Sequence, residues 1–204
     1  MRKIFSWVSR RSAVLSLLLV FTLGCTERHS GEADRQTEVV QGCEVCESLA
    51  SGAKYLGGPL KSDDLLVHES NFWKVYLFPA DQRYLGRSLA ALKRHSPSLA
   101  DLTPTEWGDL QVVIRVMEDA ARREFGAVNF NWTCLMNNAF RDNPPKPHVH
   151  MHFRPRYAAP VKFGGSLFED VLFGEHYNRE RIGVTTEMAL AITAALRTTG
   201  EQIR

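Results

Sequence analysis

The stretch KPHVHMHFRPRY, residues 146–157, places a histidine at every second position, at His148, His150 and His152. Successive side chains of a β-strand point to opposite faces of the sheet, so these three imidazoles would line one face. The Val, Met and Phe that alternate with them would line the other face, and their apolar side chains suit a core. The other four of the seven histidines are scattered along the chain.

Three explanations of this row of imidazoles are open. One is a strand face in contact with water, although such faces usually carry Thr, Lys, Glu and Ser rather than repeated histidine. The others are a metal site and a catalytic site, since imidazole serves as nucleophile, general base and metal ligand near neutral pH. A carrier that binds copper or zinc directly through the three imidazoles is one form of the metal site.

Length and composition indicate one ordinary globular domain. The chain has 204 residues, of which 44% are hydrophobic and 24% are charged. Its net charge of +2 arises at the start, where four basic residues and no acidic residue occupy the first 24 positions. Taking those four from the 25 basic residues leaves 21 against 23 acidic residues, a net charge of −2. Nucleic acid is therefore not expected as a partner.

The first 24 residues have the features of an export signal. MRKIFSWVSRR is basic, and the apolar run at residues 13–23 is too short for an ordinary membrane span but suits a signal peptide. SRRSAVL is similar to a twin-arginine signal, and TLGC, ending at Cys25, resembles the lipobox in which a cysteine is lipidated after cleavage. We expect export, with membrane contact only through a lipid on Cys25 or the signal segment. An uncleaved anchor and cytoplasmic residence are the alternatives.

Four segments are expected along the chain. A signal peptide at 1–24 precedes a flexible tether at 25–42, which is polar and lacks periodicity. A folded domain at 43–157 and a carboxyl-terminal extension at 158–204 follow. We expect the extension to be mostly irregular until a final helix over 185–204.

Residues 103–126 carry the clearest helix signals. Thr103 and Glu106 form a capping box, Pro104 stands at the first helical position, and Gly126 supplies the carboxyl-terminal cap. Apolar residues at three- and four-residue steps predict a buried stripe of Trp107, Leu110, Ile114, Met117, Ala121 and Phe125.

Five short strands are expected around this helix. They are DLLVHES, FWKVYLFP, RSLAALKRH (87–95), VNFNWTCLMN and HVHMHFRPR. Strands and helices do not alternate as in a doubly wound protein. Consecutive strands, one long helix and then further strands favour an α+β fold with an antiparallel sheet.

Cys43 and Cys46 form a C-x-x-C motif at the start of the folded domain. This spacing is typical of half a zinc site or of a redox pair, and a disulfide is the alternative in an exported protein. His95 and His148 supply two imidazoles that would complete a tetrahedral Cys2His2 zinc site. Such a split site would staple distant parts of the chain, because its ligands meet only in the folded state.

These pieces together resemble the histidine triad (HIT) superfamily of nucleotide hydrolases and transferases. Alternating histidines, as at 148–152, are its signature, and PRY at 155–157 is common in bacterial members. The C-x-x-C motif, LKRH followed by LADLTPTEW, the long helix, and LMNN before the triad occur in the same order as in the family. The resemblance covers roughly residues 43–157. It implies a HIT-like α+β fold, a five-stranded antiparallel sheet with one long helix, and usually a homodimer.

The resemblance also implies roles for individual residues. His150 would be the nucleophile, and His152 would contact the phosphate. Asn137 matches a position that holds an amide near the nucleotide, and Arg156 is close enough to the triad to bind phosphate. A structural zinc would be bound by Cys43, Cys46, His95 and His148.

The sequence departs from the family pattern at two places. Many members have a Gln and a Ser or Thr just before the triad, where this chain has Pro144 and Pro145. The Asp that binds ribose in many members is not evident after the second strand, and Asp81 is the nearest substitute. We expect a nucleotide phosphohydrolase or nucleotidyl transferase acting at an α-phosphate, on a diadenosine polyphosphate or phosphoramidate. A noncatalytic nucleotide- or metal-binding module is the alternative.

Overall fold

The computed structural model describes residues 39–51, 60–176 and 180–201. The chain separates into two units, Met1–Ala33 and Asp34–Arg204, and every described residue belongs to the second. The expected signal segment, Cys25 and most of the tether lie outside the described residues. Within the described ranges, no helix combines the length and apolar character needed to cross a membrane.

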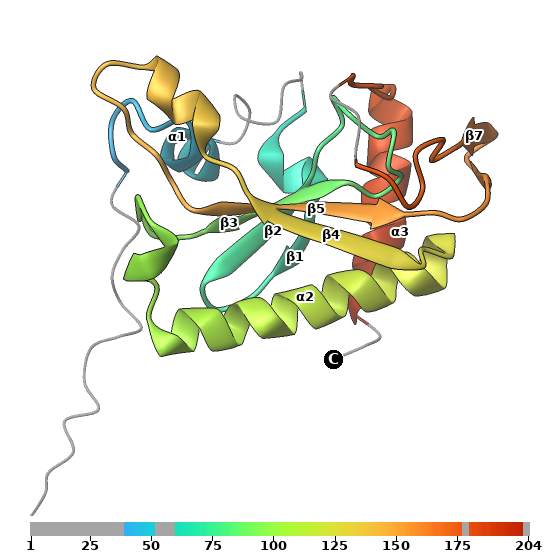
Figure 1. The fold of residues 1–204 in the computed structure, drawn as a ribbon, viewed down its shortest axis with the longest axis horizontal. Helices are drawn as coiled ribbons and strands as arrows, with labels where there is room; N and C mark the ends of the chain where they lie inside the picture. The colour runs from blue at the N-terminus through green and yellow to red at the C-terminus, as the bar shows by residue number, and fades with distance from the viewer. Residues whose placement is uncertain (1–38, 52–59, 177–179, 202–204) are drawn as a thin grey trace, which may run out of the picture. The chain divides into compact units, whose positions relative to one another are not determined.

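An antiparallel sheet of five strands forms the centre of the fold (Figure 1). In spatial order the strands are β1 (Leu66–Glu69), β2 (Trp73–Leu77), β3 (Ser88–Leu92), β5 (His150–Arg156) and β4 (Asn129–Cys134). The strand that carries the alternating histidines therefore has a hydrogen-bonded neighbour on each side. This arrangement confirms the expected α+β fold with a five-stranded antiparallel sheet.

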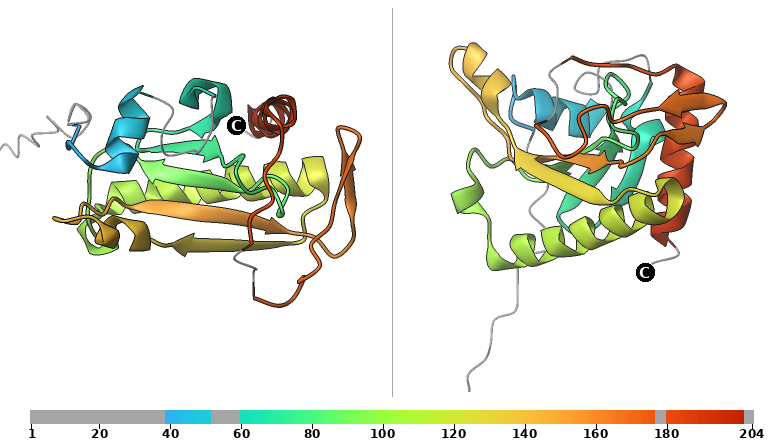
Figure 2. Two further views of the ribbon diagram at one scale, coloured as in Figure 1. Left: turned by 90° about the horizontal axis from the view of Figure 1, so that it is seen from above. Right: turned by 45° about the vertical axis from the view of Figure 1, so that its right-hand side comes forward.

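One long helix, α2 (Pro104–Phe125), runs along one face of the sheet (Figures 1 and 2). Its predicted end signals are confirmed: the Thr103 hydroxyl accepts from Glu106 N–H, the Glu106 carboxylate accepts from Thr103 N–H, and Gly126 adopts a left-handed conformation. The core lies between this helix and the sheet. Its largest buried side chains on the two surfaces include Trp73, Leu77, Phe153, Leu110 and Met117.

The apolar stripe predicted for this helix is wrong at its first position. Trp107 is 45% exposed, whereas its neighbour Glu106 is buried. The buried face runs through Leu110, Val113 and Met117, so a step of one turn back from Leu110 reaches Glu106 rather than Trp107. A carboxylate can occupy this inward position because it meets a cationic partner there, as described below.

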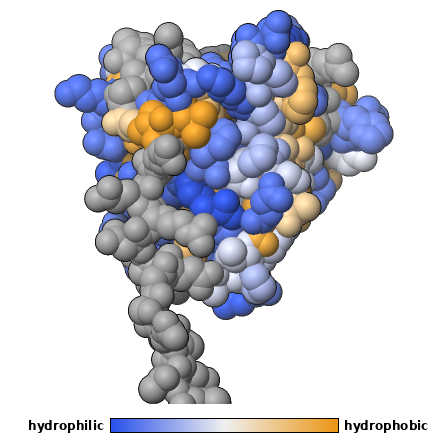
Figure 3. All heavy atoms as spheres, turned by 90° about the vertical axis from the view of Figure 1, so that its left-hand side faces the viewer, coloured by the Kyte–Doolittle hydropathy of each residue, from blue (hydrophilic) through white to orange (hydrophobic). Residues whose placement is uncertain are grey.

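The opposite face of the sheet is covered at one end by α1 (Glu44–Ser51), which begins within the C-x-x-C motif. A small buried cluster joins α1 to β3 through Cys43, Val45, Cys46 and Ala91. The carboxyl-terminal helix α3 (Thr186–Glu201) packs against α2 and β1, and Ile192 and Leu196 enter the main core. Figure 3 shows the end of the molecule that carries α1 and the start of α2, and its surface is largely hydrophilic.

Two expectations about strand ends are corrected. β3 ends at Leu92, so His95 follows the strand in a loop, and β5 begins at His150, so His148 precedes it. Lys93 N–H still bonds to the Phe72 carbonyl beyond the last paired residue, and the chain then leaves the sheet as the Arg94 side chain bonds to Glu106 of α2. Loop positions at both histidines let their rings approach α1.

The connections contain short elements that the sequence did not predict. The extension expected to be mostly irregular forms a hairpin of β6 (Val161–Phe163) and β7 (Ser166–Phe168). Single 3-10 turns occur at η1 (Ser62–Leu65), η2 (Leu99–Asp101) and η3 (Asn137–Arg141).

Candidate active site and metal centre

A cavity of about 260 Å³ opens on the sheet face that α2 does not cover. All three histidines of the triad line it, together with Leu89 from the neighbouring strand β3 and Phe78, which follows β2. The remaining lining residues come from several segments, among them η3, the start of α1 and the segment before α3. They are Gly42, Glu44, Val45, Ala80, Arg87, Leu135, Met136, Asn138, Ala139, Asp142, Lys146 and Arg181. The predicted row of imidazoles therefore faces a cavity rather than bulk water.

Strand register explains why the histidines share this face. His150 lies opposite Ala91 and His152 lies opposite Leu89 in the antiparallel pair of β5 and β3. Residues that face each other across such a pair point to the same side of the sheet. Val149 and Phe153 point to the other side and are completely buried in the core.

The His150 ring is fixed by its own backbone. Its Nδ1 lies 2.9 Å from the carbonyl oxygen of His148, and the carbonyl can only accept, so Nδ1 carries the proton. The lone pair is then on Nε2. Burial lowers the pKa of His150 below its ordinary value, because desolvation disfavours the charged ring more than the His148 carbonyl favours it. The arrangement supplies a neutral imidazole with a defined nucleophilic nitrogen.

His152 is also held in the neutral form. Burial is the main cause that lowers its pKa to about 3, and the guanidinium groups of Arg154 and Arg87 add to the effect. Its ring centroid lies 5.0 Å from that of His150. The Nδ1 atom of His152 is buried and has no hydrogen-bond partner among the described residues. A buried polar atom without a partner favours a ligand that supplies one.

The structure brings together the four predicted metal ligands. Within the described residues, Cys43, Cys46, His95 and His148 form one cluster whose ligand atoms all lie within 4.8 Å of one another. Cys46 Sγ is 3.4 Å from His95 Nδ1 and 3.2 Å from His148 Nδ1, and Cys43 Sγ is 3.5 Å from His148 Nδ1. Zinc bonds of about 2.3 Å to sulfur and 2.0 Å to nitrogen give a sulfur-to-nitrogen edge of roughly 3.5 Å in a tetrahedron. The donor set and its spacing therefore fit zinc.

One of the two thiols already favours the deprotonated form that a metal site needs, whereas the hydrogen bond with Cys43 and burial raise the pKa of Cys46. Cys43 and Cys46 are free cysteines rather than a disulfide. The hydrogen bond from Cys46 lowers the pKa of Cys43 despite burial, and the contact with His148 adds to the effect. The Cys46 backbone N–H also donates to Cys43 Sγ at 3.4 Å. One thiolate is thus already favoured, and thiolate is the form of cysteine that binds zinc.

The metal cluster contains neither His150 nor His152. His148 directs Nδ1 toward the cysteines, while its Nε2 donates to the Leu92 carbonyl at 2.8 Å. A backbone carbonyl on the outer nitrogen fixes the ring of a metal-binding histidine. The alternative of a carrier with three histidine ligands is therefore not supported in the described part of the chain.

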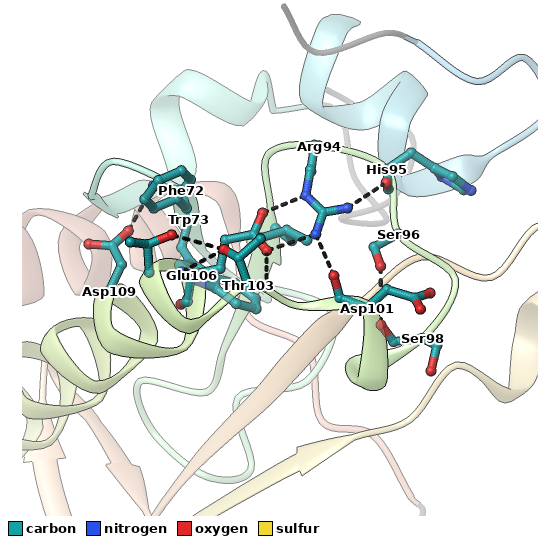
Figure 4. Close-up of polar contacts among 12 residues, drawn as sticks. Phe72, Trp73, Arg94, His95, Ser96, Ser98, Asp101, Thr103, Glu106 and Asp109 are labelled. Atoms are coloured by element: carbon teal, nitrogen blue, oxygen red, sulfur yellow. Dashed lines mark hydrogen bonds and ion pairs between the residues drawn. The ribbon is translucent and has the colours of Figure 1, made fainter. Parts of the chain in front are cut away.

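A polar network holds the loop that carries His95 (Figure 4). Arg94 donates through Nε and Nη2 to the two carboxylate oxygens of Glu106, at 2.5 and 2.7 Å, and to the Asp101 carbonyl at 2.8 Å. The same carboxylate accepts from Thr103 N–H at 2.8 Å. Burial raises the pKa of Glu106, but the bonds from Arg94 and Thr103 outweigh it and the net shift is downward. One buried carboxylate thus caps α2 and anchors the residue next to a metal ligand.

The two predicted substrate ligands lie away from the cavity walls. Asn137 is exposed as the first residue of η3, and the cavity is lined instead by Asn138. Arg156 is 2% exposed and donates to both oxygens of Asp170, at 2.6 and 3.1 Å. It shares the histidine face but lies six residues beyond His150, about 20 Å along the strand. The structure therefore gives Arg156 a partner within the protein.

Asp81, the proposed substitute for a ribose-binding residue, also has its partners within the protein. Its carboxylate is 1% exposed and forms an ion pair with Arg87, and its Oδ1 accepts from the Ile182 N–H at 3.2 Å.

Sequence reasoning missed Arg87 and Arg181 as cavity residues. Arg87 alternates with Leu89 and Ala91 along β3, which is a signal, but nothing in the sequence indicated that β3 lies beside β5. No motif marks Arg181.

Comparison with known proteins bears on the fold. The sequence matches no protein-family model and no curated protein. The structure aligns with a hypothetical histidine triad nucleotide-binding protein from Sulfolobus tokodaii strain7 at a TM-score of 0.50 and 14% identity, covering 68% of this chain and 85% of that one. It aligns with the C. elegans NitFhit protein at 0.50 and 19% identity, covering 73% and 30%. A Zn-bound histidine triad family protein from Mycobacterium smegmatis gives 0.47 and 20%, covering 72% and 92%. The first two alignments show a HIT-like fold.

Proposed function

We propose that this protein is a nucleotide phosphohydrolase or nucleotidyl transferase of the HIT superfamily that forms a covalent intermediate on His150. One observation carries the proposal. Nδ1 of His150 is hydrogen-bonded to a backbone carbonyl, which leaves the lone pair on Nε2 of a ring that lines a cavity. The HIT-like fold supports this proposal, as does the name of one protein that shares the fold, a hypothetical histidine triad nucleotide-binding protein.

The reaction would proceed in two displacements. Nε2 of His150 attacks the α-phosphorus of a nucleoside 5′-phosphate derivative, and the bond from phosphorus to the leaving group breaks with its electron pair on the leaving atom. Water or another acceptor then attacks the same phosphorus. The phosphorus–nitrogen bond breaks, its electrons return to Nε2, and a proton of the acceptor is released. Phosphoryl transfer depends chiefly on positioning and charge stabilisation, and one covalent intermediate divides it into two easier steps.

His152 would bind a nonbridging oxygen of the same phosphate. Its ring adjoins that of His150, and its buried Nδ1 has no partner among the described residues. If the ring takes its proton on this nitrogen, releasing the bond of its other nitrogen to the Leu135 backbone, it would donate to the oxygen. Donors placed in advance around the phosphorus stabilise the charge that develops in the transition state.

Zinc would be held by Cys43, Cys46, His95 and His148 as a structural ion. With four protein ligands it supplies rigidity and leaves no coordination position for water or substrate. The protein links this metal site to the nucleophile through the backbone between His148 and His150, the first residue of β5. When the ring of His148 is fixed, its backbone carbonyl is fixed too, and that carbonyl orients the His150 ring. The proposed metal centre is thus a positioning device for the nucleophile.

The decisive experiment traps the intermediate. The purified protein is incubated with diadenosine polyphosphate or adenosine phosphoramidate labelled in the nucleotide, quenched rapidly, and digested for mass spectrometry. We expect a nucleotidylated peptide that contains His150. Turnover with the label on another residue would overturn the mechanism. Absence of turnover, with nucleotide binding unchanged in His150→Ala, would instead support the noncatalytic module.

We also propose a homodimer and a location outside the cytoplasm. β4 stands at an edge of the sheet and pairs with β5 on one side, so its other edge is a surface on which a second copy can align. Sedimentation of the folded part at several concentrations tests the dimer.

Loss of fatty-acid labelling on Cys25→Ser in the producing cell tests the lipid anchor proposed for export, and labelling that persists would exclude Cys25.

A further inference from the structure

Three basic side chains reach the active-site cavity from separate parts of the chain. Arg87 precedes β3, Lys146 lies in the loop before the triad, and Arg181 lies in the segment that leads to α3. A cavity that holds a neutral nucleophile at one place and several cations at others is suited to an anionic ligand. The cations differ, however, in how far the protein already compensates their charge.

Two of them have partners within the protein. Arg87 is 7% exposed and forms a buried ion pair with Asp81. Lys146 donates through Nζ to the carbonyl oxygen of Gln41. The charge of Arg87 is thus offset by a carboxylate, and the ammonium of Lys146 is tied to the segment that precedes α1.

Arg181 differs from both. Among residues 39–51, 60–176 and 180–201, no carboxylate forms an ion pair with it, and its neighbour Glu180 is bound by Arg83 at 2.8 Å. Its Cζ lies 5.4 Å from the centroid of the Phe78 ring, which also lines the cavity. An aromatic ring orients a guanidinium without neutralising it and leaves its N–H groups available to a ligand.

The backbone places Arg181 at this position firmly. Gln82 N–H donates to the Ile182 carbonyl at 2.6 Å, and Val184 N–H donates to the Pro79 carbonyl at 3.1 Å. Ile182 N–H in turn donates to Asp81. The residue after Arg181 is therefore bonded in both directions to the loop between β2 and β3. An exposed side chain on a backbone fixed in this way can serve as a rigid contact at the mouth of the cavity.

The strand register gives the direction from the nucleophile to this arginine. His150 is level with Ala91, and Arg87, the residue before β3 begins, lies four residues earlier, about 13 Å along the strand direction. At this end the Phe78 N–H donates to the Arg87 carbonyl at 3.0 Å, and the guanidinium of Arg181 lies over the Phe78 ring. The cavity thus extends from the triad toward a cationic end, with room for groups beyond the attacked phosphorus.

We propose that Arg181 is a specificity-determining residue that binds an anionic, phosphate-bearing leaving group; this inference rests on the function proposed above. When Nε2 of His150 bonds to the α-phosphorus, the bond to the bridging oxygen breaks and its electron pair stays on the departing phosphate. Arg181 donates hydrogen bonds to that phosphate. A neutral leaving group such as ammonia gains nothing from the contact, so the residue selects polyphosphate substrates over phosphoramidates.

The test compares two substrates that share the same adenosine 5′-phosphoryl group. Steady-state kinetics are measured for the wild-type chain, Arg181→Ala and Arg181→Lys on a diadenosine polyphosphate and on adenosine phosphoramidate. We expect Arg181→Ala to lower kcat/KM roughly 10- to 100-fold on the polyphosphate and less than about 2-fold on the phosphoramidate. Arg181→Lys should recover part of the loss, since it keeps the charge but not the planar fork.

A matched control removes an exposed arginine elsewhere. Arg115 lies on α2, on the other side of the sheet, and Arg115→Ala should leave both substrates unaffected. Equal losses on both substrates in Arg181→Ala, or no loss on either, would overturn the assignment while leaving the proposed function intact. Absence of wild-type turnover on both substrates would reject the proposed function itself.

Discussion

The Nδ1 atom of His150 lies 2.9 Å from the carbonyl oxygen of His148, whose own ring belongs to the metal cluster. Two adjoining sites therefore share one short piece of backbone. The ring of His148 faces the cysteines, and its backbone carbonyl selects the tautomer of His150, the proposed nucleophile. This relationship explains how alternating histidines can perform different tasks although they line the same sheet face.

Removal of the nucleophile should abolish turnover without loss of the metal. We expect His150→Ala to lower kcat by about 10³-fold or more, because both displacements pass through its Nε2. Zinc content, measured by atomic emission on the purified variant, should stay equal to that of the wild-type chain, since His150 is outside the metal cluster. Loss of zinc together with activity would contradict the division of roles.

Removal of a metal ligand should first cost the protein its zinc and its stability, and the loss of activity should follow from these. Cys46→Ser should lose zinc and destabilise the fold by about 3 kcal/mol or more, because the ligands join α1 to the ends of β3 and β5. Chelation of wild-type protein should do the same, with activity falling as the His148 carbonyl loses its fixed position. Thermal unfolding with and without chelator measures the effect. Cys134→Ser, a cysteine outside the cluster, is the control.

Loss of Arg94 should destabilise the protein although Arg94 itself is partly exposed. Its removal leaves the carboxylate of Glu106, 2% exposed, without its cationic partner. We expect Arg94→Ala to lower the free energy of unfolding by about 2–4 kcal/mol, as for other broken buried pairs. Lys93→Ala, the adjacent residue with a more exposed partner at Glu69, should cost less than about 1 kcal/mol. Urea unfolding of both variants decides the comparison, and similar losses would refute it.

Elements of the fold that are determined by neighbouring residues can be predicted from the sequence, whereas features that depend on distant residues cannot. The capping box, Pro104 and Gly126 are local, and the long helix was predicted from them correctly. The alternation of the triad is also local, and it predicted a shared sheet face. The inward turn of Glu106 depends on Arg94, twelve residues away, so helix periodicity alone placed Trp107 in the core instead.

In the candidate site, too, the residues that belong to a local motif were predicted, and the residues that depend on distant contacts were not. The four proposed metal ligands were predicted because C-x-x-C and the triad are recognisable motifs that resemble a known family. Arg156 was expected near phosphate because it lies close to the triad in sequence, but its partner Asp170 comes from the extension, for which no motif exists. Arg181 reaches the cavity through backbone bonds to a loop about one hundred residues earlier. Such a contact follows from the fold and leaves no trace in the sequence.

Acid should weaken the fold partly through Glu106. Its pKa is lowered below the ordinary 4.5 in the folded protein, so its contribution to stability is complete above that value. The contribution is lost as the pH falls through the lower pKa of the folded state, because the unfolded chain takes up the proton first. Unfolding by urea between pH 7 and pH 3 should show a shallower acid dependence in Glu106→Gln, which keeps the cap but not the charge. An unchanged slope would assign the acid dependence to other groups.

His152 should remain neutral throughout the physiological range. Burial and the surrounding positive charges lower its pKa to about 3, so its ring resonances in a two-dimensional nitrogen–proton spectrum should not shift between pH 8 and pH 5. The ring of a fully solvated histidine, in contrast, titrates near 6.5 and would shift over this range. The unfolded chain binds a proton at His152 as the pH falls below that ordinary value, whereas the folded chain does not, so the fold loses stability between about pH 6.5 and pH 3. His152→Gln should remove this part of the pH dependence. A His152 resonance that titrates near 6.5 would show that the cavity is open to water and would undermine the neutral phosphate donor proposed above.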